Sequence, residues 1–214
     1  MERSSRLPVI TIDGPAGAGK STVARLLARR LGLRFLDTGA MYRAVALKAG
    51  RLGLSDPARI AAMIRDTRIA VEEERVTCDG EDVTREIRRP EVTAAVRPIA
   101  DSPECRAELV RMQREIGRGG GLVTEGRDQG SVVFPDAEHK FYLDASVEER
   151  ARRRAGELGG EAGALREAIE RRDAQDRARP VGPLVRPEGA LRIDSSGLTV
   201  EEVVARMAAS VGSR

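Results

Sequence analysis

Short apolar runs alternate with longer amphipathic stretches along most of the chain. The apolar runs are rich in Val, Ile and Leu and predict short buried strands. Between them, apolar residues recur at helical spacing, most clearly in residues 21–31. Strands that alternate with helices predict an α/β fold, a parallel sheet of about five strands flanked by helices. The strand candidates are residues 8–12, 33–36, 122–124, 140–143 and 191–193.

Two stretches depart from this alternation. Residues 67–97 carry short β-like runs separated by charged and glycine-containing turns, which predicts a small antiparallel insertion. The core would then consist of residues 1–66 and 98–214. Residues 156–164 are rich in glycine and poor in packing side chains, so we expect a loop or a lid hinge there, within a lid near 150–165.

The first predicted strand leads into a glycine-rich turn that precedes a helix. Residues 14–21 read GPAGAGKS and match G-x-x-x-x-G-K-[ST] without a mismatch. Glycines let the backbone turn its N–H groups toward an anion, and the helix N-terminus adds a favourable dipole. In this motif the lysine reaches the β- and γ-phosphates of a nucleotide, and the hydroxyl that follows can bind Mg²⁺.

The sequence therefore predicts a site for ATP with Mg²⁺, in which Ser21 is the metal-binding residue. The residues expected to hold the nucleotide are Gly14, Pro15, Ala16, Gly17, Ala18, Gly19, Lys20, Ser21 and Thr22. A glycine-rich turn without a ligand is the alternative, but Lys and Ser at the start of a helix have no packing reason. The motif does not identify the second substrate, because many P-loop proteins share it.

Two polar clusters follow predicted strands, at the edge where an α/β sheet opens onto its ligand crevice. Thr38, Tyr42 and Arg43 come directly after the second strand. Arg127 and Asp128, between glycines, come after the 122–124 strand. These hydroxyl, guanidinium and carboxylate groups suit a phosphorylated acceptor. Taken alone, each cluster is also typical of an ordinary surface turn.

A third cluster lies on a predicted helix. Arg172, Asp176 and Arg179 are spaced i, i+4 and i+7 and would share one helix face. Two arginines beside a carboxylate can hold a phosphate and a sugar hydroxyl together. An exposed, salt-bridged helix face would show the same pattern.

Composition favours small anions over a nucleic-acid polyanion. Arg accounts for 34 of the 37 basic residues, yet the formal net charge is only +3. Arg binds phosphate bidentately, although most single arginines are expected on solvated surface. Aromatic residues make up 2% of the chain, so we expect no base-stacking surface for nucleic acid.

Other features bear on compartment and partners. No apolar run approaches the roughly 20 residues that span a bilayer, and residues 1–6 do not resemble a signal peptide. Cys78 and Cys105 predict neither a disulfide framework nor a zinc site. We expect a cytoplasmic monomer with small-molecule substrates and without a nucleic-acid or membrane partner.

Six segments together resemble bacterial cytidylate kinases, a branch of the nucleoside monophosphate kinases. They occur in order and at plausible spacings over nearly the whole chain. The resemblance implies transfer of the γ-phosphoryl group of ATP to CMP or dCMP, giving ADP and CDP or dCDP. It also implies that the 67–97 insertion is the small β-rich domain that binds the monophosphate. The six segments are residues 9–22, 36–43, 80–84, 125–130, 132–137 and 172–177.

The resemblance also implies roles for residues at matching positions. Arg43, Arg127 and Arg179 would grip the phosphate of the monophosphate. Arg106 and Asp128 would read the edge of the cytosine.

Further positions would complete the acceptor site by the same resemblance. Arg172 and Asp176 would bind the sugar, and Thr38 and Tyr42 would line the pocket. This chain departs from the family at Arg97, where the family often carries a serine expected near the cytosine amino group. An arginine cannot accept a hydrogen bond from that group.

The expected reaction needs no strong general base, because the attacking oxygen belongs to a phosphate that is already an anion. Catalysis would rest on alignment and on positive charge from Lys20, Arg127, Arg153 and Arg154, the last two acting as lid residues over the triphosphate. The single histidine, His139, is expected to be structural or on the surface.

Two other functions fit parts of the sequence. Another small P-loop kinase, acting on UMP or a shikimate-type substrate, shares the phosphate loop, although a shikimate-type kinase would want a second acidic residue at Gly39. A nucleic-acid-stimulated P-loop ATPase is suggested by the isoelectric point near 9.2. The scarcity of aromatic residues argues against the second.

Overall fold

The computed structural model describes residues 7–72, 75–158 and 161–212. The chain forms two compact units: unit 1 comprises residues 1–34 and 120–214, and unit 2 comprises residues 35–119. Within the described ranges, no helix has both the length and the apolar character that a membrane crossing requires.

The main sheet has five strands, as the sequence predicts, and their order is β2-β6-β1-β7-β8. The strands β1, β2 and β6 are short runs of mostly buried side chains, whereas only Ile193 is buried in β8. The strands β1, β6, β7 and β8 pair in parallel. The strand β2 begins at the last residue of unit 1. The strands are β1 (Val9–Asp13), β2 (Arg34–Asp37), β6 (Leu122–Gly126), β7 (His139–Asp144) and β8 (Leu191–Asp194).

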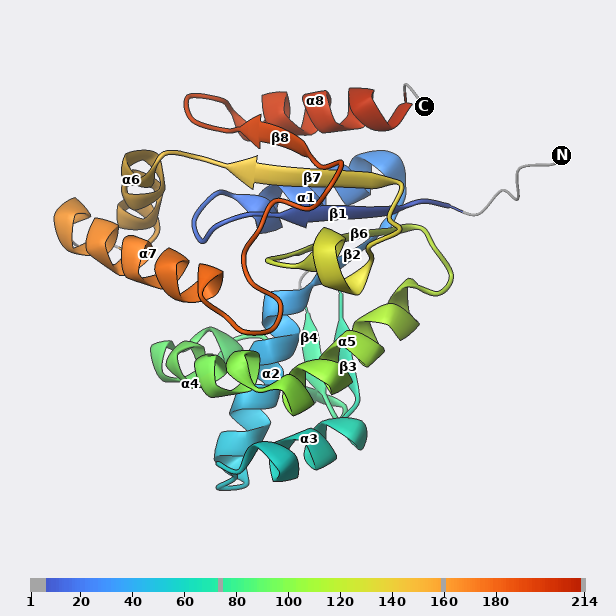
Figure 1. Ribbon diagram of the computed structural model, residues 1–214, viewed down its shortest axis with the longest axis vertical. Coiled ribbons are helices and arrows are strands. Elements are labelled where there is room, and N and C mark those ends of the chain that lie inside the picture. Colours follow the sequence, from blue (N-terminus) through green and yellow to red (C-terminus); the bar gives the residue numbers. More distant parts are fainter. Residues whose placement is uncertain (1–6, 73–74, 159–160, 213–214) are drawn as a thin grey trace, which may run out of the picture. The chain divides into compact units, whose positions relative to one another are not determined.

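The register of the sheet aligns the carboxyl ends of its central strands. Asp13, the last residue of β1, lies opposite Gly126 of β6 and Tyr142 of β7. The segments that follow these three strands therefore start at one edge of the sheet. Figure 1 shows β7 pointing toward the side on which α6 (Val147–Leu158) and α7 (Ala162–Arg177) lie.

Helices α1 (Lys20–Leu31) and α8 (Val200–Gly212) pack together in unit 1, and α1 also packs on β6. Gly32, at a φ of 66°, ends α1 in the left-handed conformation that favours glycine. Thr199 and Glu202 precede and open α8 as a reciprocal capping box: the Glu202 N–H donates to Thr199 Oγ1 at 3.2 Å, and the Thr199 N–H donates to Glu202 Oε2 at 2.8 Å.

Unit 2 combines helices with the small antiparallel sheet β3-β4-β5, which confirms the predicted antiparallel strands. One side of α2 buries alanines, such as Ala40 and Ala44, against Val76 and Cys78 of β4 and Ile87. The elements are α2 (Thr38–Arg51), α3 (Pro57–Arg65), β3 (Ile69–Val71), β4 (Val76–Cys78), β5 (Glu81–Asp82), the 3₁₀ turn η1 (Glu86–Arg88), α4 (Pro90–Asp101) and α5 (Pro103–Gly117).

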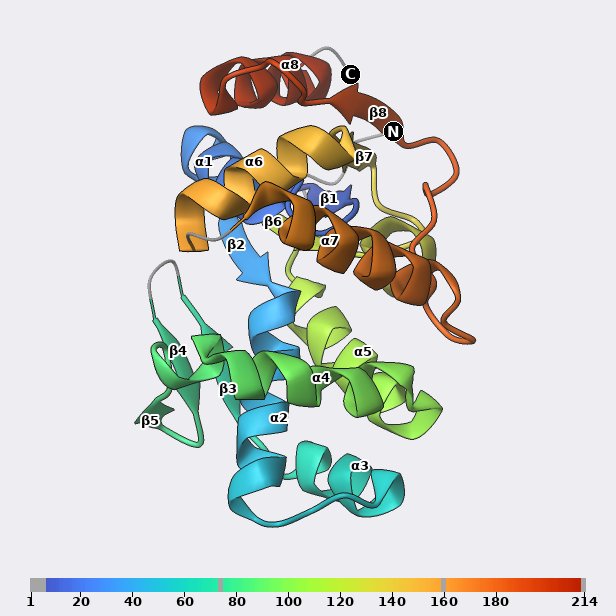
Figure 2. The same ribbon diagram turned by 90° about the vertical axis from the view of Figure 1, so that its left-hand side faces the viewer.

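The structure differs from the sequence-based expectation in two places. Residues 90–101 form α4, which the pattern did not predict, with Pro98 inside the helix. Residues 156–158 and 162–164 of the glycine-rich stretch are helical, since α6 continues to Leu158 and α7 begins at Ala162. These two helices lie side by side in Figure 2 and pack against each other. Gly159 and Gly160, at the centre of the expected hinge, lie outside the described residues.

Candidate active site

The phosphate loop joins β1 to α1 in unit 1, in the context that its motif requires. Gly14 has a φ of 151°, and a Cβ there would lie 2.0 Å from the backbone oxygen of Leu143 in β7. Gly19 caps α1 with a φ of 86°, in the left-handed region. Only glycine allows this close backbone approach and this conformation without strain. The loop therefore places its backbone at the carboxyl edge of the sheet.

Lys20 and Ser21 begin α1 and point into a polar interior. Lys20 is 5% exposed, and its Nζ donates to the Pro15 oxygen at 2.7 Å. Burial lowers the pKa of Lys20 to about 7, and repulsion from Arg127 adds to this, while Glu125 opposes it. Ser21 Oγ donates to Glu125 Oε1, at the end of β6, at 2.6 Å. The protein groups around Lys20 thus do not fully stabilise its charged form. A bound polyphosphate would supply the missing negative charge.

Asp176 pairs with two arginines that lie in separate polar clusters of the sequence. Arg127, directly after β6, donates from Nε to Asp176 Oδ2 at 2.8 Å, and Arg179 forms an ion pair with Asp176. Burial alone would raise the pKa of Asp176, but Arg127 and Arg179 outweigh it and hold the pKa below its ordinary value. Arg172 is exposed on α7, and Arg179 lies beyond the end of that helix rather than on its face.

The arginines of α6 take different positions. Arg153 donates from Nε to Glu149 at 2.8 Å and from NH2 to the Ser195 oxygen, after β8, at 2.8 Å. Arg154 is exposed. Arg150, which sequence reasoning did not assign, is buried and donates from NH1 to the Ala16 oxygen of the phosphate loop at 3.0 Å and to Asp173 Oδ2 at 2.7 Å.

Arg150 therefore ties the phosphate loop to α7 through one buried guanidinium. Both Arg150 and Asp173 have side chains that are only 3% exposed. No sequence signal separated Arg150 from the other arginines of its run, because its role depends on burial.

Unit 2 brings together its own predicted residues near the start of α2. Asp37 caps this helix by accepting the Ala40 N–H at 2.8 Å and also pairs with Arg43 at 3.2 Å. The Arg106 guanidinium carbon of α5 lies 5.9 Å from the ring centre of Tyr42, in cation–π range. Thr38 is buried as the first residue of α2.

Arg97 stands apart from this group in its contacts. On α4, its side chain is 61% exposed and pairs with Asp101 at 3.3 Å. His139 begins β7, at the opposite end of that strand from the segments that follow the carboxyl edge, and is 9% exposed. The position of His139 fits the structural role expected from the sequence.

Sequence reasoning did not assign a role to two residues that make contacts in the site. Glu125 holds the Ser21 hydroxyl. Asp13 is fully buried and accepts two backbone hydrogen bonds from the turn that follows Arg127 and Asp128. The only sequence signal for both was their place at the carboxyl end of a predicted strand.

Comparison with solved structures shows the fold. The chain matches an uncharacterized protein from Eubacterium ventriosum with a TM-score of 0.59 and 11% identity, over 97% of this chain and 99% of that one. A gluconokinase from Sinorhizobium meliloti matches with a TM-score of 0.52 and 13% identity, over 98% of this chain and 94% of that one.

Sequence comparison identifies the family. Cytidylate kinases of Caldanaerobacter subterraneus and Symbiobacterium thermophilum are 50% and 47% identical to this chain. The first match covers 92% of both chains, and the second covers 95% of this chain and 96% of its relative. The profile of the family described as cytidylate kinase matches residues 10–213. The chain, with its phosphate loop and arginine clusters, therefore belongs to the cytidylate kinase family.

Proposed function

We propose that this protein transfers the γ-phosphoryl group of ATP to CMP or dCMP, giving ADP and CDP or dCDP. The observation that carries the proposal is that Lys20 of the phosphate loop lies close enough to Arg127 that, in addition to burial, repulsion lowers the pKa of Lys20, while Arg127 and Arg179 pair with Asp176, in a chain of the cytidylate kinase family. Family membership favours this reaction over a shikimate-type kinase or a nucleic-acid-stimulated ATPase.

The reaction forms a bond between a phosphate oxygen of the monophosphate and the γ-phosphorus, and breaks the bond between that phosphorus and the β,γ-bridging oxygen of ATP. The attacking oxygen is already an anion, so alignment and charge neutralisation do the work. The loop backbone and Lys20 hold the phosphates of ATP. Arg127 and Arg179 neutralise charge on the acceptor side, and Asp176 orients both guanidinium groups.

The residues present fit a magnesium ion, which we include in the proposal. The Ser21 hydroxyl and the Glu125 carboxylate are hard oxygen ligands, 2.6 Å apart at the start of α1. Mg²⁺ prefers such ligands together with waters and substrate phosphates. When bound, the ion would neutralise phosphate charge. Ser21 would hold it directly, and Glu125 would orient Ser21.

The remaining substrate roles stay predictions from the family resemblance. In unit 2, Thr38, Tyr42, Arg43 and Arg106 are assigned to the monophosphate and its base. In unit 1, Asp128 and Arg172 are assigned to the base and sugar. The assignment of Arg153 and Arg154 to a lid over the triphosphate, near residues 150–165, belongs to the same set.

The proposal includes small-molecule substrates only, a monomeric state and a cytoplasmic location. The modest net charge and the scarcity of aromatic residues support small-molecule substrates. The monomeric state is expected because no interface stripe stands out in the sequence, and the cytoplasmic location because the two cysteines predict no disulfide framework. Light scattering of the purified protein, with and without nucleotides, measures the oligomeric state directly.

A coupled ADP-release assay across all nucleoside monophosphates tests the function. We expect rapid turnover with CMP and dCMP and slower turnover with UMP. Lys20→Met should abolish turnover, because it removes the positive charge beside the phosphates. Lys140→Met, a lysine of β7 outside the loop, is the matched control and should keep it. Wild-type protein without activity on CMP and dCMP would overturn the proposal.

A further inference from the structure

At the carboxyl edge of the sheet, a buried carboxylate at the end of one strand holds the turn that follows a neighbouring strand. Asp13 ends β1 and is 0% exposed. Its Oδ1 accepts the Gln129 N–H at 2.7 Å, and its Oδ2 accepts the Gly130 N–H at 2.8 Å. The two oxygens thus hold two successive N–H groups of the π-helical turn η2 (Gln129–Val133), which follows β6. Charge-assisted hydrogen bonds of this kind are stronger than neutral ones.

This carboxylate is held against an energetic penalty. Burial raises the pKa of Asp13 to about 7, opposed by the two backbone N–H groups. Asp128, on the turn, disfavours its charge further, whereas Lys20 on α1 favours it. Burial raises the pKa of Tyr142, its register partner on β7, above the ordinary value of 10.0, so this phenol is neutral. An ionisable group kept where its charge is penalised is expected at functional sites more than in ordinary cores.

The turn that Asp13 holds is tightly confined by its surroundings. A Cβ on Gly130 would lie 2.7 Å from Thr11 Oγ1 of β1 and 3.0 Å from Pro187 Cγ. The side chain of Gln129 is also fixed, because its Oε1 accepts a hydrogen bond from Thr124 Oγ1 of β6 at 2.9 Å. The turn therefore has one closely defined position against β1 and β6.

We propose that Asp13 is a positioning residue for phosphoryl transfer, which fixes η2 against β1 and thereby sets where Arg127 and Asp128 present their side chains. These two residues directly precede η2, and Gly14, the first residue of the phosphate loop, directly follows Asp13. Asp13 thus links the phosphate loop, which binds ATP, to the turn that follows Arg127 and Asp128, which are assigned to the monophosphate. The inference rests on the proposed transfer to CMP.

Asp13→Asn is the first test. The amide replaces one acceptor oxygen with a donor, so one backbone N–H of η2 meets another donor and the turn shifts. Because small misplacements cost catalysis heavily, we expect kcat with CMP to fall about 30- to 100-fold. The Kd for ATP, measured by calorimetry, should stay within about twofold of wild type, because the loop backbone and Lys20 are unchanged.

Thr11→Val is the matched control. Thr11 lies two residues before Asp13 on the same face of β1 and faces the same Gly130. Its hydroxyl has no hydrogen-bond partner among the described residues, and valine keeps its shape. We expect both kcat with CMP and Kd for ATP to match the wild type.

Gly130→Ala displaces the same turn without touching the carboxylate, and keeps the inference testable if Asp13→Asn fails to fold. We expect the same split between kcat with CMP and Kd for ATP. Either folded variant with kcat within threefold of wild type overturns the inference. So does a loss of ATP binding in proportion to the loss of kcat, which a merely structural role would produce. Inactivity of the wild type on CMP would instead overturn the proposed function.

Discussion

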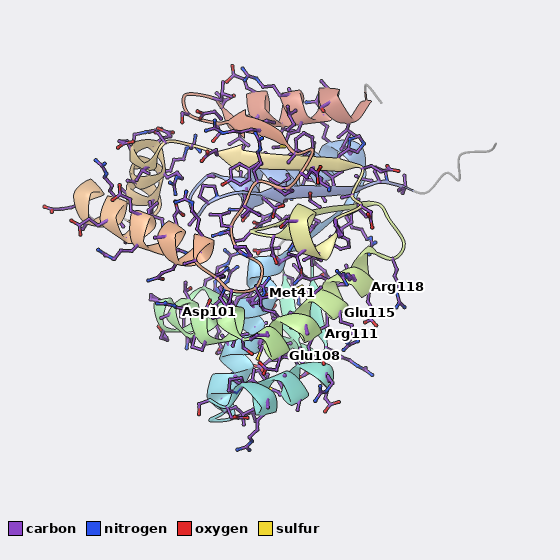
Figure 3. The ribbon with its side chains drawn as sticks, in the orientation of Figure 1. Met41, Asp101, Glu108, Arg111, Glu115 and Arg118 are labelled. Atoms are coloured by element: carbon purple, nitrogen blue, oxygen red, sulfur yellow. The ribbon has the colours of Figure 1, made fainter. Side chains whose placement is uncertain are left out.

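Two sets of arginine ion pairs, one from each unit, differ sharply in burial. In unit 1, Arg150 and Asp173 pair with side chains that are both 3% exposed. In unit 2, Arg111 pairs with Glu108 and Glu115 along α5, where its side chain is 47% exposed (Figure 3). Exposed pairs contribute little, whereas breaking a buried pair leaves an uncompensated charge. The comparison shows that burial, not residue type, decides how much an arginine ion pair contributes to stability.

The largest effect is expected for Arg127→Ala. The variant removes positive charge where negative charge develops, so kcat/KM for CMP should fall about 100- to 1,000-fold. Stability should change far less, because Asp176 keeps Arg179 as a partner. The coupled assay and thermal unfolding measure the two quantities. Arg177→Ala, which changes an exposed arginine of α7, the helix that carries Asp176, is the control and should stay near wild type. Wild-type kcat/KM in Arg127→Ala would contradict the role.

The buried pair gives the next effect, on stability. Arg150→Met leaves Asp173 buried without its cation and should lower the free energy of unfolding by about 3–5 kcal/mol. Arg150→Met with Asp173→Leu should recover most of that loss, because no buried charge remains. Urea unfolding of both variants measures the difference. Equal losses in the single and the double variant would show that the pair does not act as a unit.

Asp13 gives a smaller effect that depends on pH. Its pKa in the folded protein, about 7, exceeds the ordinary value of 3.8, so the native state binds a proton that the unfolded chain has released. Between about pH 4 and pH 7, the contribution of Asp13 to the free energy of unfolding therefore falls as the pH rises. The stability of wild type relative to Asp13→Asn should therefore be greater at pH 5 than at pH 8. A difference that is independent of pH in urea unfolding would refute the raised pKa.

The smallest effect is expected on the surface of unit 2. Arg111→Ala removes two ion pairs from an exposed face of α5 and should change the free energy of unfolding by less than about 0.5 kcal/mol. Activity with CMP should not change. A loss of more than about 2 kcal/mol would remove the contrast between the two sets of pairs.

Much of the fold could be predicted from the sequence. The phosphate loop and the parallel strands around it have local signals: glycines before a helix, and short β-branched runs. The helix α4 could not be predicted, because Pro98 interrupts the backbone hydrogen bonding that its sequence would otherwise support. The helical course of residues 156–158 and 162–164 was also missed, because packing between α6 and α7 outweighs the low helix propensity of glycine.

The candidate site divides in the same way. Lys20, Ser21 and the arginine clusters could be proposed from the sequence because their residues lie in short segments with fixed spacing. Arg150 and Asp13 were not, because each acts on partners far away in the chain: Ala16 and Asp173 for the first, Gln129 and Gly130 for the second. Such contacts exist only once the strands are aligned.

By itself, the sequence determined the fold class, the phosphate loop and the family, because these depend on local backbone chemistry and on residues in order along the chain. Only the tertiary structure decided which of the 34 arginines are buried and which carboxylates hold them or the turns beside them. The physical reason is that a guanidinium or a carboxylate costs little in water and much in a protein interior, and burial is a property of the folded chain.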